Sequence, residues 1–270
     1  MTAENEVQFF VSPLPFLQSV VDQLLLSPCL RASKVIALPY SRSLSPYFEE
    51  VVNGAPFETI MGCLLEAGLI TSPTKQWKQV TKRLLEGLRQ VKRDHPDVAI
   101  ECFKPDGYEE WVVHTSTEIA ALVMRAGARG RVDVSEWRSK LLESLDFEDT
   151  VEEEIERLHD IACRRGFPVF AATWGTCVPL LRKLRSRGFR ARAIYPVKPY
   201  VKNPLEELET LVYAKGAKGI NDQLLEDIAK RYVDYVREYV MKTHSVDEAY
   251  ALWIRKEISK KLRALLTKQS

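Results

Sequence analysis

The sequence lacks the patterns that mark metal, redox and membrane proteins. Its five cysteines are scattered, so it has none of the close pairs that bind zinc or form a redox centre, and such a set suits a reducing compartment. Its four histidines form no HxH or HExxH pattern, so we expect neither a metal nor another cofactor. No apolar run reaches the roughly 18 residues of a membrane span, and the N-terminus has no basic segment typical of a signal peptide. We therefore expect a cytoplasmic protein without a membrane partner.

The chain also lacks an excess of charge of one sign, because its formal net charge is only +2. The charges are nevertheless segregated. Residues 143–160 carry nine acids against one base, and residues 180–203 carry eight bases and no acid. A basic block of this kind is either a solvated surface or a field that attracts a polyanion. The low glycine count, together with many Lys, Arg and Glu residues, suits a thermophile.

Short apolar runs alternate with helical patterns over the first 200 residues. The spacing predicts five strands, at residues 7–11, 34–40, 97–103, 168–173 and 191–197. Because these runs are almost continuously apolar, they are typical of a parallel sheet covered on both faces. The first strand, helix and second strand span about thirty residues and read as a βαβ unit with paired parallel strands.

The predicted fold class is therefore α/β, with a doubly wound, mostly parallel sheet in three layers and a helical C-terminal appendage. We place the α/β domain at residues 1–200, with a helical insertion at about 55–140, and the helical C-terminal region at residues 201–270.

Small polar residues follow several of the predicted strands. In open α/β sheets, ligands bind beyond the carboxyl ends of the strands, where helix N-termini present free N–H groups. The sequence predicts a phosphate-binding edge there, formed by Ser12, Tyr40, Ser41, Arg42, Ser43, Thr173, Trp174, Gly175, Thr176 and Cys177. In this interpretation the hydroxyls and N–H groups bind the phosphate, and Arg42 with the bases at 182–202 supplies the countercharge.

Each of these residues also has a simpler interpretation. Ser and Thr before a helix are ordinary N-caps. Tyr40 and Trp174 could stack on bases or could be buried aromatics at strand ends. Cys177 could be a nucleophile at a helix N-terminus or a small buried side chain.

Other candidates stand outside this edge. Glu101 and Asp106 flank the end of the third strand and could act as general acid and base, or lie in solvent or in a turn. His114 and Glu118 are spaced as a metal pair but lack a third ligand. The C-terminal segment KEISKKLRALLTK could contact nucleic acid or form an amphipathic docking or dimer helix.

Between Asp146 and Tyr195, an acidic helix leads to the strand PVFAAT, then to TWGT, a helix and GFRARAIY. This segment resembles the CRISPR-associated Rossmann-fold (CARF) domains. In that family a late strand ends in Thr-Gly-Gly-Thr-Lys. The N-terminal FFVSPLP and KVIALPYSRS also resemble the opening strands of the family. The sequence departs from the family at Trp174 and Cys177, which replace a glycine and the lysine.

The CARF resemblance implies a Rossmann-like homodimer that binds cyclic oligoadenylates in CRISPR-type antiviral defence. It implicates Ser12, Thr173, Gly175 and Thr176, and some family members slowly cleave the ring. Because the motif lysine is missing, Lys183 or Arg182 would have to substitute for it.

A second segment, HPDVAIECFKPDGYEEW, is similar to the TraB/ChaN-like family of metal hydrolases, but neither expected histidine is present. Three functions therefore remain open. The first is a nucleotide sensor with or without metal-independent phosphodiesterase activity. The second is a degenerate hydrolase centred on Glu101 and Cys177. The third is a non-catalytic interaction protein that presents its C-terminal helices to a nucleic acid or protein partner.

Overall fold

The computed structural model describes residues 7–15, 17–144, 148–197 and 200–266. The chain divides into two compact units. The first comprises residues 1–117 and 146–198, and the second comprises residues 118–145 and 199–270. Helix α6 (Tyr108–Arg129) begins in the first unit and continues into the second.

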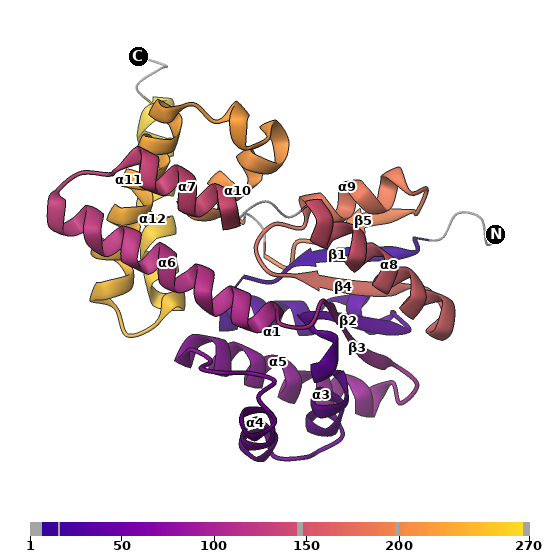
Figure 1. The fold of residues 1–270 in the computed structure, drawn as a ribbon. Coiled ribbons are helices and arrows are strands. Elements are labelled where there is room, and N and C mark those ends of the chain that lie inside the picture. Colours follow the sequence, from indigo (N-terminus) through magenta and orange to yellow (C-terminus); the bar gives the residue numbers. More distant parts are fainter. Residues whose placement is uncertain (1–6, 16, 145–147, 198–199, 267–270) are drawn as a thin grey trace. The chain divides into compact units, whose positions relative to one another are not determined.

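The first unit is built on a five-stranded sheet in which all paired strands are parallel (Figure 1). The strands lie in the order β3-β2-β4-β1-β5. Their bounds are Phe9–Pro13 for β1, Val35–Ser41 for β2, Ala99–Lys104 for β3, Val169–Thr173 for β4 and Ala191–Ala193 for β5. The α/β fold class predicted from the apolar runs is confirmed.

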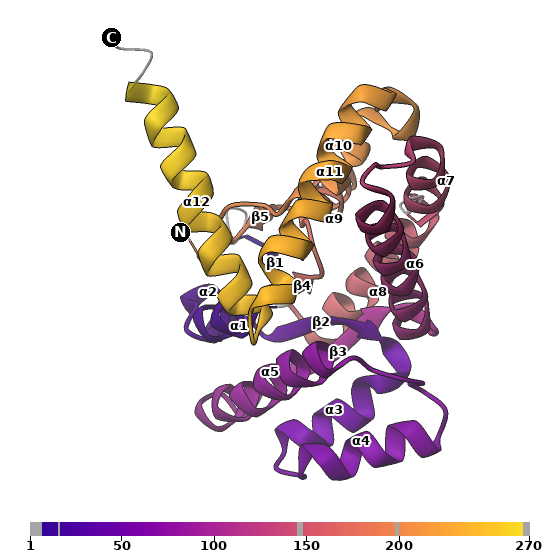
Figure 2. The same cartoon turned by 90° about the vertical axis from the view of Figure 1, so that its left-hand side faces the viewer.

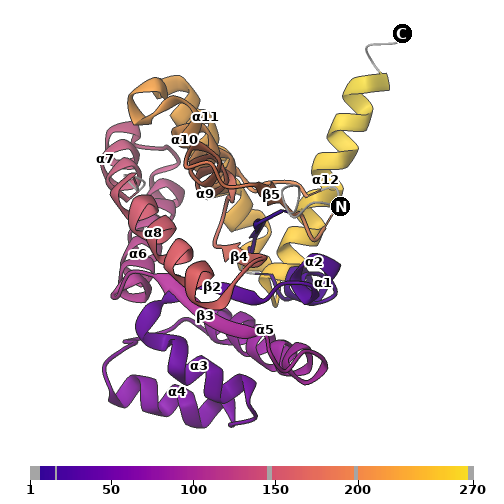
Figure 3. The same cartoon turned by 90° about the vertical axis from the view of Figure 1, so that its right-hand side faces the viewer.

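Side chains of the central strands alternate between two separate cores. In β2, Val35 and Ala37 pack in one core, and Ile36, Leu38 and Tyr40 pack in the other. The bounds of the helices are α1 Gln18–Leu25, α2 Pro28–Arg31, α3 Ser45–Val52, α4 Phe57–Glu66, α5 Lys75–Asp94, α8 Glu148–Arg165 and α9 Val178–Ser186. Helices α1, α3 and α5 share the core of Ile36, whereas α8 and α9 share the core of Val35 (Figure 3). The three predicted layers are therefore confirmed.

The order of the strands differs from the expectation at one place. Strands β1 and β2 run in the same direction but are not neighbours, because β4 lies between them and pairs with both. The expected pairing of the first two strands is therefore wrong. A strand–helix–strand spacing sets direction and leaves adjacency open, and β4 is buried along its whole length, as suits a central strand.

Local sequence explains where the longer helices begin and end. Helix α5 begins after Thr74, whose hydroxyl accepts a hydrogen bond from the Trp77 N–H at 3.1 Å. It ends before His95, which precedes Pro96, a residue that cannot continue a helix. Helix α10 (Pro204–Lys215) begins at a capping box formed by Asn203 and Glu206.

The second unit is entirely helical within its described residues. It contains the end of α6, α7 (Val134–Ser144), α10 (Pro204–Lys215), α11 (Asp222–Glu238) and α12 (Val246–Leu266). Helices α10 and α11 run side by side (Figure 2). The core is formed by residues such as Trp137, Leu208 and Leu225, so residues 118–145 pack with the C-terminal helices. No helix among the residues described is both long and apolar enough to span a bilayer.

Candidate ligand-binding edge of the sheet

The strand order creates a topological switch point at β4. The chain leaving β1 and β2 enters helices on one face of the sheet, and the chain leaving β4 enters α9 on the other. Ligands of open α/β sheets bind in the crevice that forms where neighbouring connections diverge in this way. The turn between β4 and α9 contains Thr173, Trp174, Gly175, Thr176 and Cys177, so this predicted segment lies at the switch point.

The turn has the backbone of a tight strand-to-helix connection. Gly175 adopts a φ of +66°, in the left-handed region that glycine enters without strain. The Thr176 hydroxyl accepts a hydrogen bond from the Val178 N–H at 3.3 Å, at the start of α9. The Thr176 oxygen thus closes a local turn just before α9, whose N-cap residue is Cys177, and the Thr176 hydroxyl proton can still be donated elsewhere.

Ser12 and Thr173 lie together at the ends of β1 and β4. Both are buried, and the Thr173 hydroxyl donates to the Ser12 carbonyl at 3.4 Å. The Ser12 hydroxyl donates to the Pro13 carbonyl at 3.2 Å, and the Leu14 N–H donates to the Thr173 carbonyl at 2.7 Å. These two hydroxyls therefore hold the strand ends, where they can position the turn that follows.

Tyr40 is part of the core. Its hydroxyl lies 2.9 Å from the Thr81 hydroxyl, and its ring makes edge contacts with Phe48, Trp77 and Trp174. Complete burial raises the pKa of Tyr40 well above its ordinary value. Of the two interpretations of this residue, the structure favours the buried aromatic. Trp174 is half-buried and rests edge-on against the Tyr40 ring.

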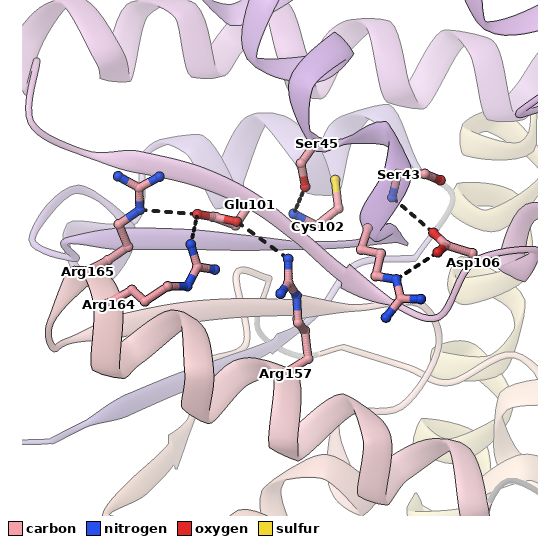
Figure 4. A network of polar contacts seen from close by, with 9 residues as sticks. Ser43, Ser45, Glu101, Cys102, Asp106, Arg157, Arg164 and Arg165 are labelled. Atoms are coloured by element: carbon pink, nitrogen blue, oxygen red, sulfur yellow. Dashed lines mark hydrogen bonds and ion pairs between the residues drawn. The ribbon is translucent and has the colours of Figure 1, made fainter. Parts of the chain in front are cut away.

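The loop after β2 is held by two carboxylates from the segment after β3. The Ser41 N–H donates to Glu109 Oε1 at 2.9 Å, and the Ser41 hydroxyl donates to the other oxygen of the same carboxylate. The Ser43 N–H donates to Asp106 Oδ1 at 3.1 Å (Figure 4). Arg42 Nε donates to Asp106 Oδ2 at 2.7 Å. The groups predicted to bind a phosphate here therefore bind the protein's own carboxylates.

The two carboxylates differ in environment. Burial works to raise the pKa of Asp106, but hydrogen bonds from Arg42 and Ser43 outweigh it and lower that pKa. Burial raises the pKa of Glu109 despite its hydrogen bonds from Ser41. Glu109 did not stand out in the sequence. Its only signal is its place in the first turn of a helix after an Asp-Gly turn, where acids are favoured.

Cys177 lies in the core beneath α9. It is buried, and its thiol is 3.8 Å from the Tyr195 hydroxyl. Burial is the main cause of a raised Tyr195 pKa. Because the Tyr195 hydroxyl contacts Cys177, its ring lies near the turn, as does the ring of Trp174. Tyr195 is 37% exposed. Of the two interpretations of Cys177, the structure favours the small buried side chain.

Glu101 is surrounded by arginines of α8. Its carboxylate lies 3.2 Å from Arg165 Nε, 3.6 Å from Arg164 Nη1 and 4.0 Å from Arg157 Nη2 (Figure 4). A carboxylate held by three guanidinium groups is poorly suited to act as a general base. The hydrolase interpretation, which rests on Glu101 and Cys177, gains no support from these positions.

The remaining candidates do not gather into a metal site. His114 is exposed, and Glu118 forms an ion pair with Lys140 at 3.1 Å. Over the described part of the chain, no group of three or more His, Cys, Asp or Glu side chains is arranged to hold a metal ion. The C-terminal segment lies largely outside the residues whose side chains are described.

The acidic and basic blocks meet in the layer of α8 and α9. Glu152 of α8 forms ion pairs with Lys183 and with Arg187, the latter at 2.6 Å. Arg185 Nε donates to the Ala191 carbonyl at 3.0 Å. Part of the basic block is therefore neutralised within the molecule. Lys183, one of two predicted substitutes for the missing lysine, is engaged with Glu152.

The fold and this edge define an α/β protein with a candidate ligand site at its topological switch point. No protein-family model, curated protein or solved structure matches the chain.

Proposed function

We propose that the first unit binds a phosphate-bearing nucleotide, of the kind represented by cyclic oligoadenylates, at the Thr173–Cys177 turn. One observation carries the proposal: the segment that resembles the CARF motif occupies the switch point of a doubly wound sheet. Gly175 lets the ligand approach the backbone, and Thr176 has a hydroxyl proton to donate. Trp174 and Tyr195 offer rings for base stacking.

Arg42 has a conditional role in this proposal. Arg42 is paired with Asp106, so it can neutralise a phosphate only by exchanging that partner. The pair is about half exposed, and exposed ion pairs contribute little to stability because solvent and salt screen them. A ligand that brings two negative charges to the edge can therefore replace Asp106 as the partner of Arg42.

Ring cleavage would need no nucleophile from the protein. A ribose 2′-hydroxyl would lose its proton to solvent as its oxygen attacks the neighbouring phosphorus. The P–O5′ bond would break, and the released 5′-oxygen would take up a proton from solvent, leaving a 2′,3′-cyclic phosphate. The turn would orient the ring, and Arg42 would stabilise the developing charge. The CARF resemblance further suggests a homodimer, with the edges of two copies forming one site.

The direct test is calorimetric titration with cyclic oligoadenylates, with ATP and AMP as linear comparisons. Thr176→Ala should weaken binding by about tenfold, the loss expected for one hydrogen bond to a charged group. Ser186→Ala is the matched control, because Ser186 is exposed at the other end of α9. The proposal fails if no nucleotide binds, or if the Thr176 variant binds as tightly as the control.

Light scattering on the same samples tests the homodimer. If nucleotides do not bind, the two alternatives regain weight: a hydrolase relative that has lost its metal histidines, and an interaction protein without catalysis.

A further inference from the structure

Three arginines of α8 converge on the Glu101 carboxylate of β3 (Figure 4). We call Arg157, Arg164 and Arg165 the arginine cluster. Glu101 is the third residue of β3, and Arg165 ends the helix that leads into the start of β4. The arginine cluster therefore lies toward the amino-terminal ends of the strands, whereas the proposed nucleotide site lies beyond their carboxyl ends.

The arginine cluster carries more positive charge than the protein neutralises. Within the described residues, Glu101 is the one carboxylate in ion-pair contact with it, so two of its three positive charges have no counterion. Lys34 adds a fourth cation at the end of α8. Its Nζ lies 3.3 Å from the position that a Cβ would occupy on Gly166, the residue after Arg165. Lys34 is exposed, and in the described part of the chain it forms no ion pair of its own.

The hydrogen-bonding capacity of the arginine cluster is also incompletely used. Arg165 Nε donates to Glu101 at 3.2 Å, but the contacts of Arg164 and Arg157 with this carboxylate, at 3.6 Å and 4.0 Å, are longer than hydrogen bonds. The Arg157 Nε atom is buried and has no hydrogen-bond partner among the described residues. Because a buried N–H without an acceptor is costly, an oxyanion that reaches this guanidinium would supply what it lacks.

Helix electrostatics explain only part of this arrangement. Arg164 and Arg165 lie in the last turn of α8, where the macrodipole favours cations. Arg157 lies two turns earlier, beyond the reach of that effect, and still points to the same carboxylate (Figure 4). The three side chains are between 31% and 51% exposed, so a ligand in solution can reach them.

We propose that the arginine cluster binds a phosphomonoester, either on a small molecule or on a phosphorylated side chain. At neutral pH such a group carries close to two negative charges and presents three acceptor oxygens, which match the two uncompensated charges and the unused N–H groups. Guanidinium groups bind phosphate oxygens through paired N–H donors, so several arginines suit this anion. Glu101 holds Arg165 in place beside the ligand.

The experiment is calorimetric titration of the full chain with glycerol 3-phosphate and with a phosphoserine peptide. Acetate and the unphosphorylated peptide are the comparisons, and we expect neither to bind under the same conditions. Tighter binding of the phosphopeptide would identify a phosphorylated protein as the source of the ligand, and tighter binding of glycerol 3-phosphate would identify a small molecule. Absence of binding by both phosphomonoesters would overturn the proposal.

Variants of the arginine cluster test its charge and its donors. Arg157→Gln should weaken binding by at least about tenfold, because it removes a charged donor. Arg93→Gln is the matched control, since it removes the same charge from an exposed residue of α5, on the other face of the sheet. Glu101→Gln should bind several-fold more tightly, because it removes a negative charge beside the ligand and keeps an acceptor for Arg165. Thermal melting would establish that each variant is folded.

Two results with these variants would contradict the proposal. One is equal affinity of the Arg157 and Arg93 variants, and the other is weaker binding by Glu101→Gln. Thr176→Ala separates this site from the proposed nucleotide site, because it should bind glycerol 3-phosphate as tightly as the unaltered protein does. Cyclic oligoadenylates contain only phosphodiesters, so their failure to bind would leave the phosphomonoester site standing.

Discussion

The hydroxyl pair between Tyr40 and Thr81 gives the sharpest test of which edge residues belong to the core. Both side chains are completely buried, and their oxygens lie 2.9 Å apart. Tyr40→Phe keeps every ring contact and leaves the Thr81 hydroxyl without its partner, which should cost about 1–3 kcal/mol. Thr81→Val, which has the same shape, should cost a similar amount by stranding the Tyr40 hydroxyl.

The double variant should be less destabilised than the sum of the two single variants, by about 1 kcal/mol, because neither group is then left unpaired. Thermal unfolding followed by circular dichroism resolves this, since 1 kcal/mol shifts Tm by roughly 2–4 °C in a domain of this size. Tyr40→Phe should also bind nucleotide as the unaltered protein does. Two results would refute a core role for Tyr40. One is a stability loss of the double variant equal to the sum of the losses of the two single variants. The other is a large loss of nucleotide binding by Tyr40→Phe with no loss of stability.

Three further predictions follow from named contacts. Lys104 forms an ion pair with Glu154, whose side chain is only 6% exposed. Lys104→Met leaves that carboxylate unpaired and should lower stability by about 3–5 kcal/mol. In thermal melts, the double variant Lys104→Met/Glu154→Leu should recover most of this loss. Asp106→Asn removes the charge that pairs with Arg42, so calorimetry should show a few-fold tighter binding of nucleotide, with little change in thermal stability. Burial raises the pKa of Glu209 in the folded protein to about 8, above the ordinary glutamate value. The folded state therefore binds more protons than the unfolded state, and stability falls as pH rises to about 8. Glu209→Gln removes this titration, so the amount by which its Tm exceeds that of the unaltered protein should be small near pH 5, grow to about pH 8 and then level off. A Tm difference that does not change with pH would contradict the last prediction.

The sequence predicted all five strands, although β5 ends at Ala193 and not at residue 197 as expected, and it predicted their order only in part. Each strand is a short apolar run that needs burial on both faces, so the runs at 34–40 and 168–173 are visible without any tertiary information. Adjacency depends on which strands pack best side by side after all have formed. That is why the insertion of β4 between β1 and β2 could not be deduced from the spacing.

The candidate site, like the strand order, could be predicted from the sequence only in part. Gly175 and Thr176 were recognisable because a glycine and a hydroxyl at a strand-to-helix turn have local consequences, and the structure places both there. The ion pair between Arg42 and Asp106 could not be predicted from the sequence, because it joins residues 64 positions apart across the ends of two strands.

The charge blocks decide what kind of anion the edge could recognise. The long basic block suggested a field for a polyanion, but Lys183 and Arg187 are matched to Glu152 on the neighbouring helix. Arg42 is matched to Asp106 in the same way. Within the described turn itself, residues 173–177, the side chains and backbone are neutral, and they include the Gly175 backbone, the Thr176 hydroxyl and the Trp174 ring. Long nucleic acids bind through many cations and lose affinity steeply with salt, whereas neutral donors at a helix N-terminus suit one or a few phosphates. The edge is therefore better suited to a small nucleotide than to an extended polyanion.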